Sequence, residues 1–100
     1  MNIKIANIRI DNLCFRMESY GRFEIVNYYK TLSKSGKGRH VEYCYTVAYW
    51  ERDSEGYQVR FVGDRFMQVE HELFNMFLMM GQKMLNSLYE FEEDQDDPSS

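Results

Sequence analysis

The sequence has few of the residues that cross-link small proteins. It contains two cysteines and two histidines, and Cys14 and Cys44 are not part of a CxxC pair. Together with His40 and His71 they form a set of ligand types that suits zinc, but the usual paired spacing is missing. We therefore expect two buried thiols in a reducing compartment, with no bound metal and no cofactor.

Long hydrophobic runs are missing as well. The longest spans residues 76–81, far short of the roughly 20 residues that a membrane-crossing helix needs. Residues 1–12 alternate isoleucine with polar and basic residues, unlike the continuous apolar run of a signal peptide. We therefore expect a cytoplasmic protein that has no membrane partner.

The chain does contain enough apolar residues for one core. Hydrophobic residues make up 44% of the sequence and aromatic residues 16%, and a chain of 100 residues is too short to be divided into two cores. Its charge is uneven, because residues 1–39 carry eight basic and three acidic side chains, whereas residues 40–100 carry four and thirteen. We expect one domain with oppositely charged parts.

Alternation of apolar and polar residues predicts an antiparallel meander of four or five strands. The first strand has apolar residues of both parities, which a bulge near residues 6–7 would resolve. A polar loop over residues 34–39 and a glycine-containing turn over residues 53–56 separate the later strands. The strands are expected at residues 2–10, 13–19, 22–32, 40–50 and 57–61.

One long helix is expected after the strands, because residues 67–91 are rich in helix formers and contain no proline. Strands followed by a helix indicate an α+β fold with the helix packed on the sheet. Six acidic residues lie between Glu90 and Asp97, and this composition is typical of disorder. We therefore predict a single domain over residues 1–90 and a disordered acidic tail over residues 91–100.

The apolar arc of this helix covers about half of its circumference, more than the roughly 100° stripe that one sheet needs. Met76, Met79 and Met80 lie on or beside this arc. Methionine suits interfaces that adapt to a partner, so we expect these three residues to form a protein interface, for self-association or for another protein. The alternative is that the N-terminal segment folds over the helix.

A second set of residues favours nucleic acid. Tyrosines on neighbouring strands could stack unpaired bases beside a basic loop, although aromatic residues on strands also pack across their neighbours. The loop lacks the GxxxxGK[ST] spacing of a P-loop. The residues of this hypothesis are Lys34, Lys37, Arg39, Tyr43 and Tyr45, with Tyr28 and Tyr29 on the earlier strand.

No catalytic motif is present, and HExxH is excluded because Asn75 is the fourth residue after His71. We expect a non-catalytic protein-binding module that acts by surface occlusion, such as a small accessory or inhibitor protein, and that self-associates as a homodimer. A bacterial or phage source is assumed from the type of protein and from no residue. The alternatives are a single-stranded nucleic-acid-binding protein with a regulatory acidic tail, or an acidic DNA mimic.

Overall fold

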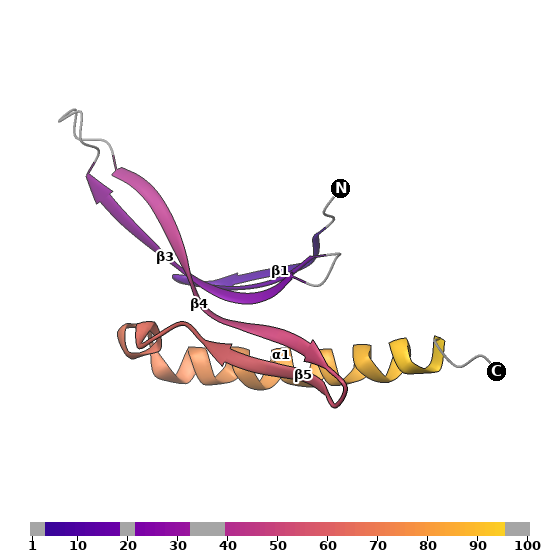
Figure 1. Cartoon of the computed structure of the whole chain (residues 1–100). Coiled ribbons are helices and arrows are strands. Elements are labelled where there is room, and N and C mark those ends of the chain that lie inside the picture. Colours follow the sequence, from indigo (N-terminus) through magenta and orange to yellow (C-terminus); the bar gives the residue numbers. More distant parts are fainter. Residues whose placement is uncertain (1–3, 19–21, 33–39, 96–100) are drawn as a thin grey trace.

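The five strands form one antiparallel sheet in the order β1-β2-β3-β4-β5, and a single helix follows them (Figure 1). The computed structural model describes residues 4–18, 22–32 and 40–95. The helix packs on the sheet, so the predicted α+β class is confirmed. The elements are β1 (Lys4–Ile10), β2 (Leu13–Glu18), β3 (Arg22–Leu32), β4 (His40–Asp53), β5 (Gly56–Phe61), the 3-10 helix η1 (Arg65–Gln68) and α1 (His71–Gln95).

The strand positions follow from local sequence pattern. Leu13, Phe15 and Met17 are buried on one face of β2, as the alternation predicts. A register shift between Lys4 and Ala6 supplies the bulge expected in β1. The turn from β4 to β5 is stabilised by Glu55, whose backbone N–H donates to the Asp53 carboxylate at 2.8 Å.

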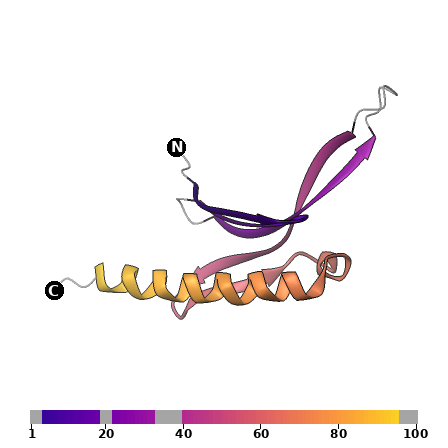
Figure 2. The same cartoon turned by 180° about the vertical axis from the view of Figure 1, so that it is seen from behind.

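The sheet holds the helix from two sides. Helix α1 contacts β5 along one side and β2 along the other. Figure 1 shows the layer of β1 to β3 above the helix and β5 alongside it, while Figure 2 shows that no strand crosses in front of the helix when it is viewed from behind. The buried core therefore lies between the sheet and one side of α1.

The helix begins four residues later than the sequence pattern indicates. Residues 65–68 form the separate helix η1, and Val69 is extended with φ −108° and ψ 162°. Glu70 then caps α1, because its carboxylate accepts hydrogen bonds from the backbone N–H groups of Glu72 at 3.1 Å and Leu73 at 2.6 Å. The capping carboxylate, which helical periodicity does not reveal, sets the start.

The helix also ends later, at Gln95, so residues 91–95 are helical and the expected disorder from residue 91 is wrong for them. The acidic turn is held by β4 and β5. The Tyr57 hydroxyl donates to Glu92 at 2.5 Å, and Arg52 lies 3.4 Å from Glu92 and 2.9 Å from Glu93. Residues 96–100 lie outside the described part of the chain.

Close contact between helix and sheet occurs at Gly81. A Cβ atom there would lie 2.7 Å from the Trp50 ring and 2.8 Å from the Phe15 ring, so glycine alone fits without displacing them. Beside this contact Gln82 accepts a hydrogen bond from Trp50 Nε1 at 2.9 Å and donates to the Tyr57 carbonyl at 2.8 Å. The fully or nearly buried helix residues are Phe74, Phe77, Gly81 and Leu85.

We expect Gly81→Ala to lower the free energy of unfolding by about 1–3 kcal/mol, because the added methyl group overpacks two buried rings. The better helix propensity of alanine, worth up to about 1 kcal/mol, opposes this effect without cancelling it. Asn75→Ala is the control, since Asn75 is an exposed helix position. Chemical denaturation measures both, and a Gly81→Ala protein at least as stable as the wild type would contradict the close contact.

We expect the stability of the folded protein to depend on pH through the Tyr57 hydroxyl. Burial, helped by the hydrogen bond to Glu92, raises the pKa of Tyr57 from 10.0 to about 12. The folded state therefore favours the neutral phenol, and its stabilisation is complete below pH 10 and is lost as the pH rises from 10 towards 12. Thermal melts should show that loss in the wild type, whereas Tyr57→Phe should show a smaller decline over the same range.

Candidate functional site

The three methionines predicted as an interface lie together on the helix surface. Met76 is 44% exposed, Met79 is 74% exposed, and Met80 is half-buried against the core. Residues three and four apart are neighbours on a helix, so Met76 adjoins both of the others. We call Met76, Met79 and Met80 the methionine face. Gly81 faces the sheet, and a residue two positions before it lies on the opposite side of a helix. Met79 therefore lies farthest from the core.

An apolar groove adjoins the methionine face. It has a volume of about 440 Å³ and lies between β2 and α1. Lys83 provides the charged group at its edge. The groove is lined by Met17, Met80, Lys83, Met84 and Ser87.

Strand β1 borders the same side of the molecule. Ile8 and Ile10 pair with Phe15 and Leu13, which are buried, so both isoleucines face the helix side of the sheet. They nevertheless remain 36% and 41% exposed. The N-terminal strands therefore cover the helix in part, through β2, but leave the methionine face uncovered among the described residues.

The tyrosines of the nucleic-acid hypothesis lie on the far part of the β3–β4 hairpin. Tyr43 is 48% exposed, and Tyr45 is half-buried. The register places Tyr29 opposite Tyr43, and their ring centroids are 5.7 Å apart with an interplanar angle of 28°. Tyr29 also lies 5.8 Å from the Tyr45 ring. We call these three residues the tyrosine face.

Tyr28 points to the opposite face of the hairpin. The Arg9 guanidinium lies 4.0 Å from its ring centroid, and Arg16 donates a hydrogen bond to its hydroxyl. Arg9 also makes a bidentate contact with Glu42, at 3.0 and 2.8 Å, and this hydrogen bonding lowers the pKa of Glu42. These contacts tie the hairpin to β1 and β2.

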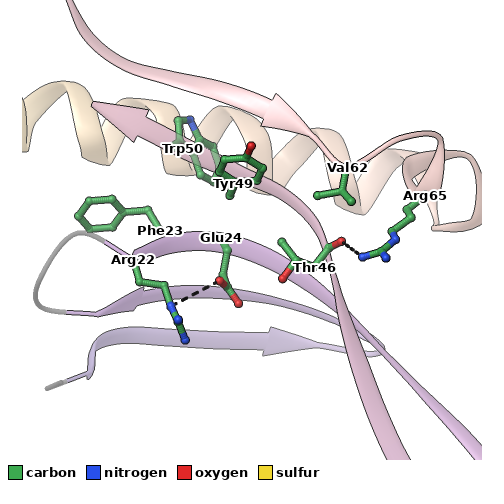
Figure 3. A pocket seen from close by; sticks show the side chains of 8 residues that line it. All are labelled: Arg22, Phe23, Glu24, Thr46, Tyr49, Trp50, Val62 and Arg65. Carbon is green, nitrogen blue, oxygen red and sulfur yellow. Dashed lines mark hydrogen bonds and ion pairs between the residues drawn. The ribbon is translucent and has the colours of Figure 1, made fainter. Parts of the chain in front are cut away.

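Arg65 connects the tyrosine face to a hollow on the molecule. Its guanidinium lies 5.3 Å from the Tyr45 ring centroid, and its Nη1 donates to the Thr46 carbonyl at 2.9 Å. The hollow has a volume of about 590 Å³. Figure 3 shows Arg65 at one end and the ion pair of Arg22 with Glu24 at the other, where Arg22 Nε and Glu24 Oε2 are 4.0 Å apart.

Sequence reasoning named Tyr29 for this surface, and pairing of the two strands brings it opposite Tyr43. It also named Tyr28, which lies on the opposite face, and it missed Arg65. No local pattern identifies Arg65, which follows the sheet in sequence and returns to β4 only in the folded chain. Lys34, Lys37 and Arg39, the basic residues of the same hypothesis, lie outside the described residues.

The two cysteines differ in environment. Cys14 is buried, and its Sγ donates to Asn7 Oδ1 at 3.0 Å. Cys44 is exposed, so the expectation that both thiols are buried is wrong for Cys44, which lies on the projecting part of β4. Among residues 4–18, 22–32 and 40–95, no group of three or more His, Cys, Asp or Glu residues is arranged to hold a metal ion.

Comparisons with family models, curated proteins and solved structures find no match to this chain. Within the part of the chain that the structure describes, no helix has the length and apolar character needed to cross a membrane. The methionine face and the tyrosine face are therefore the candidate functional surfaces of the protein.

Because Cys14 is buried and Cys44 is exposed, we expect the two thiols to react at different rates. With a chromogenic disulfide reagent we expect one thiol per chain to react quickly in the native protein and both to react in denaturant, because the reagent must reach the sulfur. Cys44→Ser should abolish the fast reaction. Fast reaction of both thiols in the native wild type would contradict the burial of Cys14.

Proposed function

We propose that the protein is a non-catalytic protein-binding module whose binding surface is the methionine face, and that a second copy of the chain occupies this surface. The observation that carries the proposal is the exposure of Met76 and Met79 beside an apolar groove. Each large apolar side chain left in water forgoes roughly 1.5–3 kcal/mol of burial. A partner surface recovers part of this free energy.

The surroundings of the methionine face support protein as the partner. The groove between β2 and α1 continues from Met80 to Met84 and Met17, and Ile8 and Ile10 extend the apolar surface on β1. Methionine side chains are unbranched and adjust to the shape of a partner. Exposed apolar residues that gather beside an apolar groove are typical of protein interaction sites.

The charge of α1 favours an antiparallel arrangement of two copies. The helix carries one lysine, Lys83, and four of its five acidic residues lie near its end, at Glu90, Glu92, Glu93 and Asp94, while Glu72 lies in its first turn. A two-fold axis that makes the helices antiparallel keeps the two acidic ends apart.

In this proposal the module acts by occupying a surface, as an accessory or inhibitor protein does, and not by chemistry. The homodimer would be either the active form or the storage form that a target displaces. Both uses place the same methionine face in contact with protein.

Sedimentation velocity at tens of micromolar tests the proposal. We expect the wild type to sediment as a dimer, and Met76→Glu and Met79→Glu to sediment as monomers, because a buried unpaired carboxylate is costly. Met67→Glu is the matched control, since Met67 is a methionine of similar exposure, 65%, located on η1.

Thermal melts of the variants show whether the fold is retained. Equal melting temperatures for Met76→Glu and Met67→Glu, with dissociation of the first alone, would support the proposal. A wild type that remains monomeric throughout this concentration range would contradict self-association. Unfolding of both Met76→Glu and Met79→Glu would show that these methionines stabilise the core instead.

A further inference from the structure

The far part of the β3–β4 hairpin projects from the rest of the protein. Strand β2 pairs with β3 only as far as Asn27, and β5 pairs with β4 only from Ala48. Beyond these points, residues 28–32 and 40–44 pair with each other and with no third described strand. We call these residues the arm. Figure 1 shows it leaving the layer of β1 and β2, and the longest extent of the molecule is 63 Å.

Aromatic rings are exposed on one face of this arm. Tyr29 and Tyr43 are 46% and 48% exposed, whereas aromatic side chains in a protein core are almost fully covered. Their rings are close to parallel, and Tyr45 continues the row towards the body of the protein. The Tyr45 ring is fixed because its hydroxyl accepts a hydrogen bond from Asn27 Nδ2 at 3.0 Å. The result is a row of flat, polar-edged surfaces.

A cation is held at the inner end of this row. Arg65 stacks over Tyr45 and is anchored by its hydrogen bond to the Thr46 carbonyl, and it is exposed to solvent. Lys30 is exposed on the arm itself. The acidic residue of the arm, Glu42, is neutralised by its bidentate contact with Arg9. Lys30 pairs with Glu42 on the face opposite the tyrosines, so the fixed positive charge beside the tyrosine face is that of Arg65.

An acidic cluster lies at the other end of the molecule, on the last turns of the helix. The acidic C-terminal turns of α1, including Glu92 and Glu93, are held against β4 and β5 by Arg52. Figure 1 places this end of the helix opposite the arm. A polyanion would thus be repelled from this helix end and attracted to Arg65 at the inner end of the tyrosine row.

From these observations we infer a second binding surface: the tyrosine face binds single-stranded nucleic acid, with bases stacking on Tyr29 and Tyr43 and Arg65 contacting the backbone phosphate. Exposed aromatic rings combined with fixed cations are the pattern of sequence-tolerant single-strand recognition. Paired bases have no free faces to offer these rings, so the surface selects unpaired strands. This inference is independent of the methionine face.

Fluorescence anisotropy with a labelled oligothymidylate at low salt tests the inference. We expect Tyr29→Thr and Tyr43→Thr each to weaken binding roughly tenfold, because each removes one stacking ring while threonine keeps the β propensity of the strand. Phe91→Ala is the matched control, since Phe91 is an exposed aromatic residue, 61%, on the acidic part of the helix. Its affinity should equal that of the wild type.

The salt dependence of nucleic-acid binding distinguishes the role of Arg65 from that of the tyrosines. Arg65→Ala should reduce the slope of the logarithm of affinity against the logarithm of salt concentration, because one phosphate contact and its released counterion are lost. Tyr29→Thr should weaken binding without changing this slope. An unchanged slope in Arg65→Ala would overturn its assignment as a phosphate contact.

Photo-crosslinking locates the site without relying on variants. An oligonucleotide containing bromodeoxyuridine should crosslink to the peptides that carry Tyr29 and Tyr43, and unlabelled duplex should not compete. No binding of oligothymidylate at low salt would overturn the inference, as would crosslinks confined to other peptides. A change of oligomeric state in the Tyr29→Thr, Tyr43→Thr double variant, with no nucleic-acid binding by the wild type, would instead assign the arm to protein contact.

Nucleic-acid binding by a variant of the methionine face distinguishes this inference from the proposed function. Met76→Glu should bind oligothymidylate as the wild type does, because the methionine face is on α1 and the tyrosine face is on the arm. Loss of nucleic-acid binding in a folded monomeric Met76→Glu protein would contradict the independence of the two surfaces.

Discussion

The close approach of α1 to the sheet at Gly81 determines how the rest of the molecule is arranged. The rings of Trp50 and Phe15 occupy the space that a side chain would take, and they stand edge to face, 5.8 Å apart. Gln82, next along the helix, is then brought to Trp50 Nε1. This contact fixes the rotation of the helix, and the rotation decides which residues are buried.

The methionine face is a consequence of that rotation. With Gly81 against the sheet, the buried stripe runs through Phe74, Phe77 and Leu85, and Met76 and Met79 are turned away from it. Strand β5 closes the opposite side of the helix, whereas β1 ends the sheet with Ile8 and Ile10 only partly covered. The sheet thus leaves one side of the helix uncovered, and the proposed partner binds on that side.

The arm arises from unequal strand lengths. Strands β3 and β4 contain 11 and 14 residues, whereas β2 and β5 contain 6 each, so the two central strands extend beyond their neighbours. An isolated pair of strands is marginally stable, and the contacts of Arg9 and Arg16 with Tyr28 support its base. Extension also explains why Tyr29, Tyr43 and Cys44 are exposed. The protein therefore separates an aromatic arm, with Arg65 at its inner end, from an acidic helix end.

The sequence alone determined the order of elements, the bulge in β1 and the inward faces of strands such as Leu13, Phe15 and Met17, because these depend on short-range periodicity. It also placed methionines at the helix surface. Only the tertiary structure decided the rotation of α1, its start at the Glu70 cap and its extension to Gln95, since Tyr57 and Arg52 hold the last turns from distant strands. The tyrosine face was likewise decided by pairing across β3 and β4 and by the return of Arg65 to Tyr45. Such contacts join residues that are far apart in the chain, so the local sequence pattern does not reveal them.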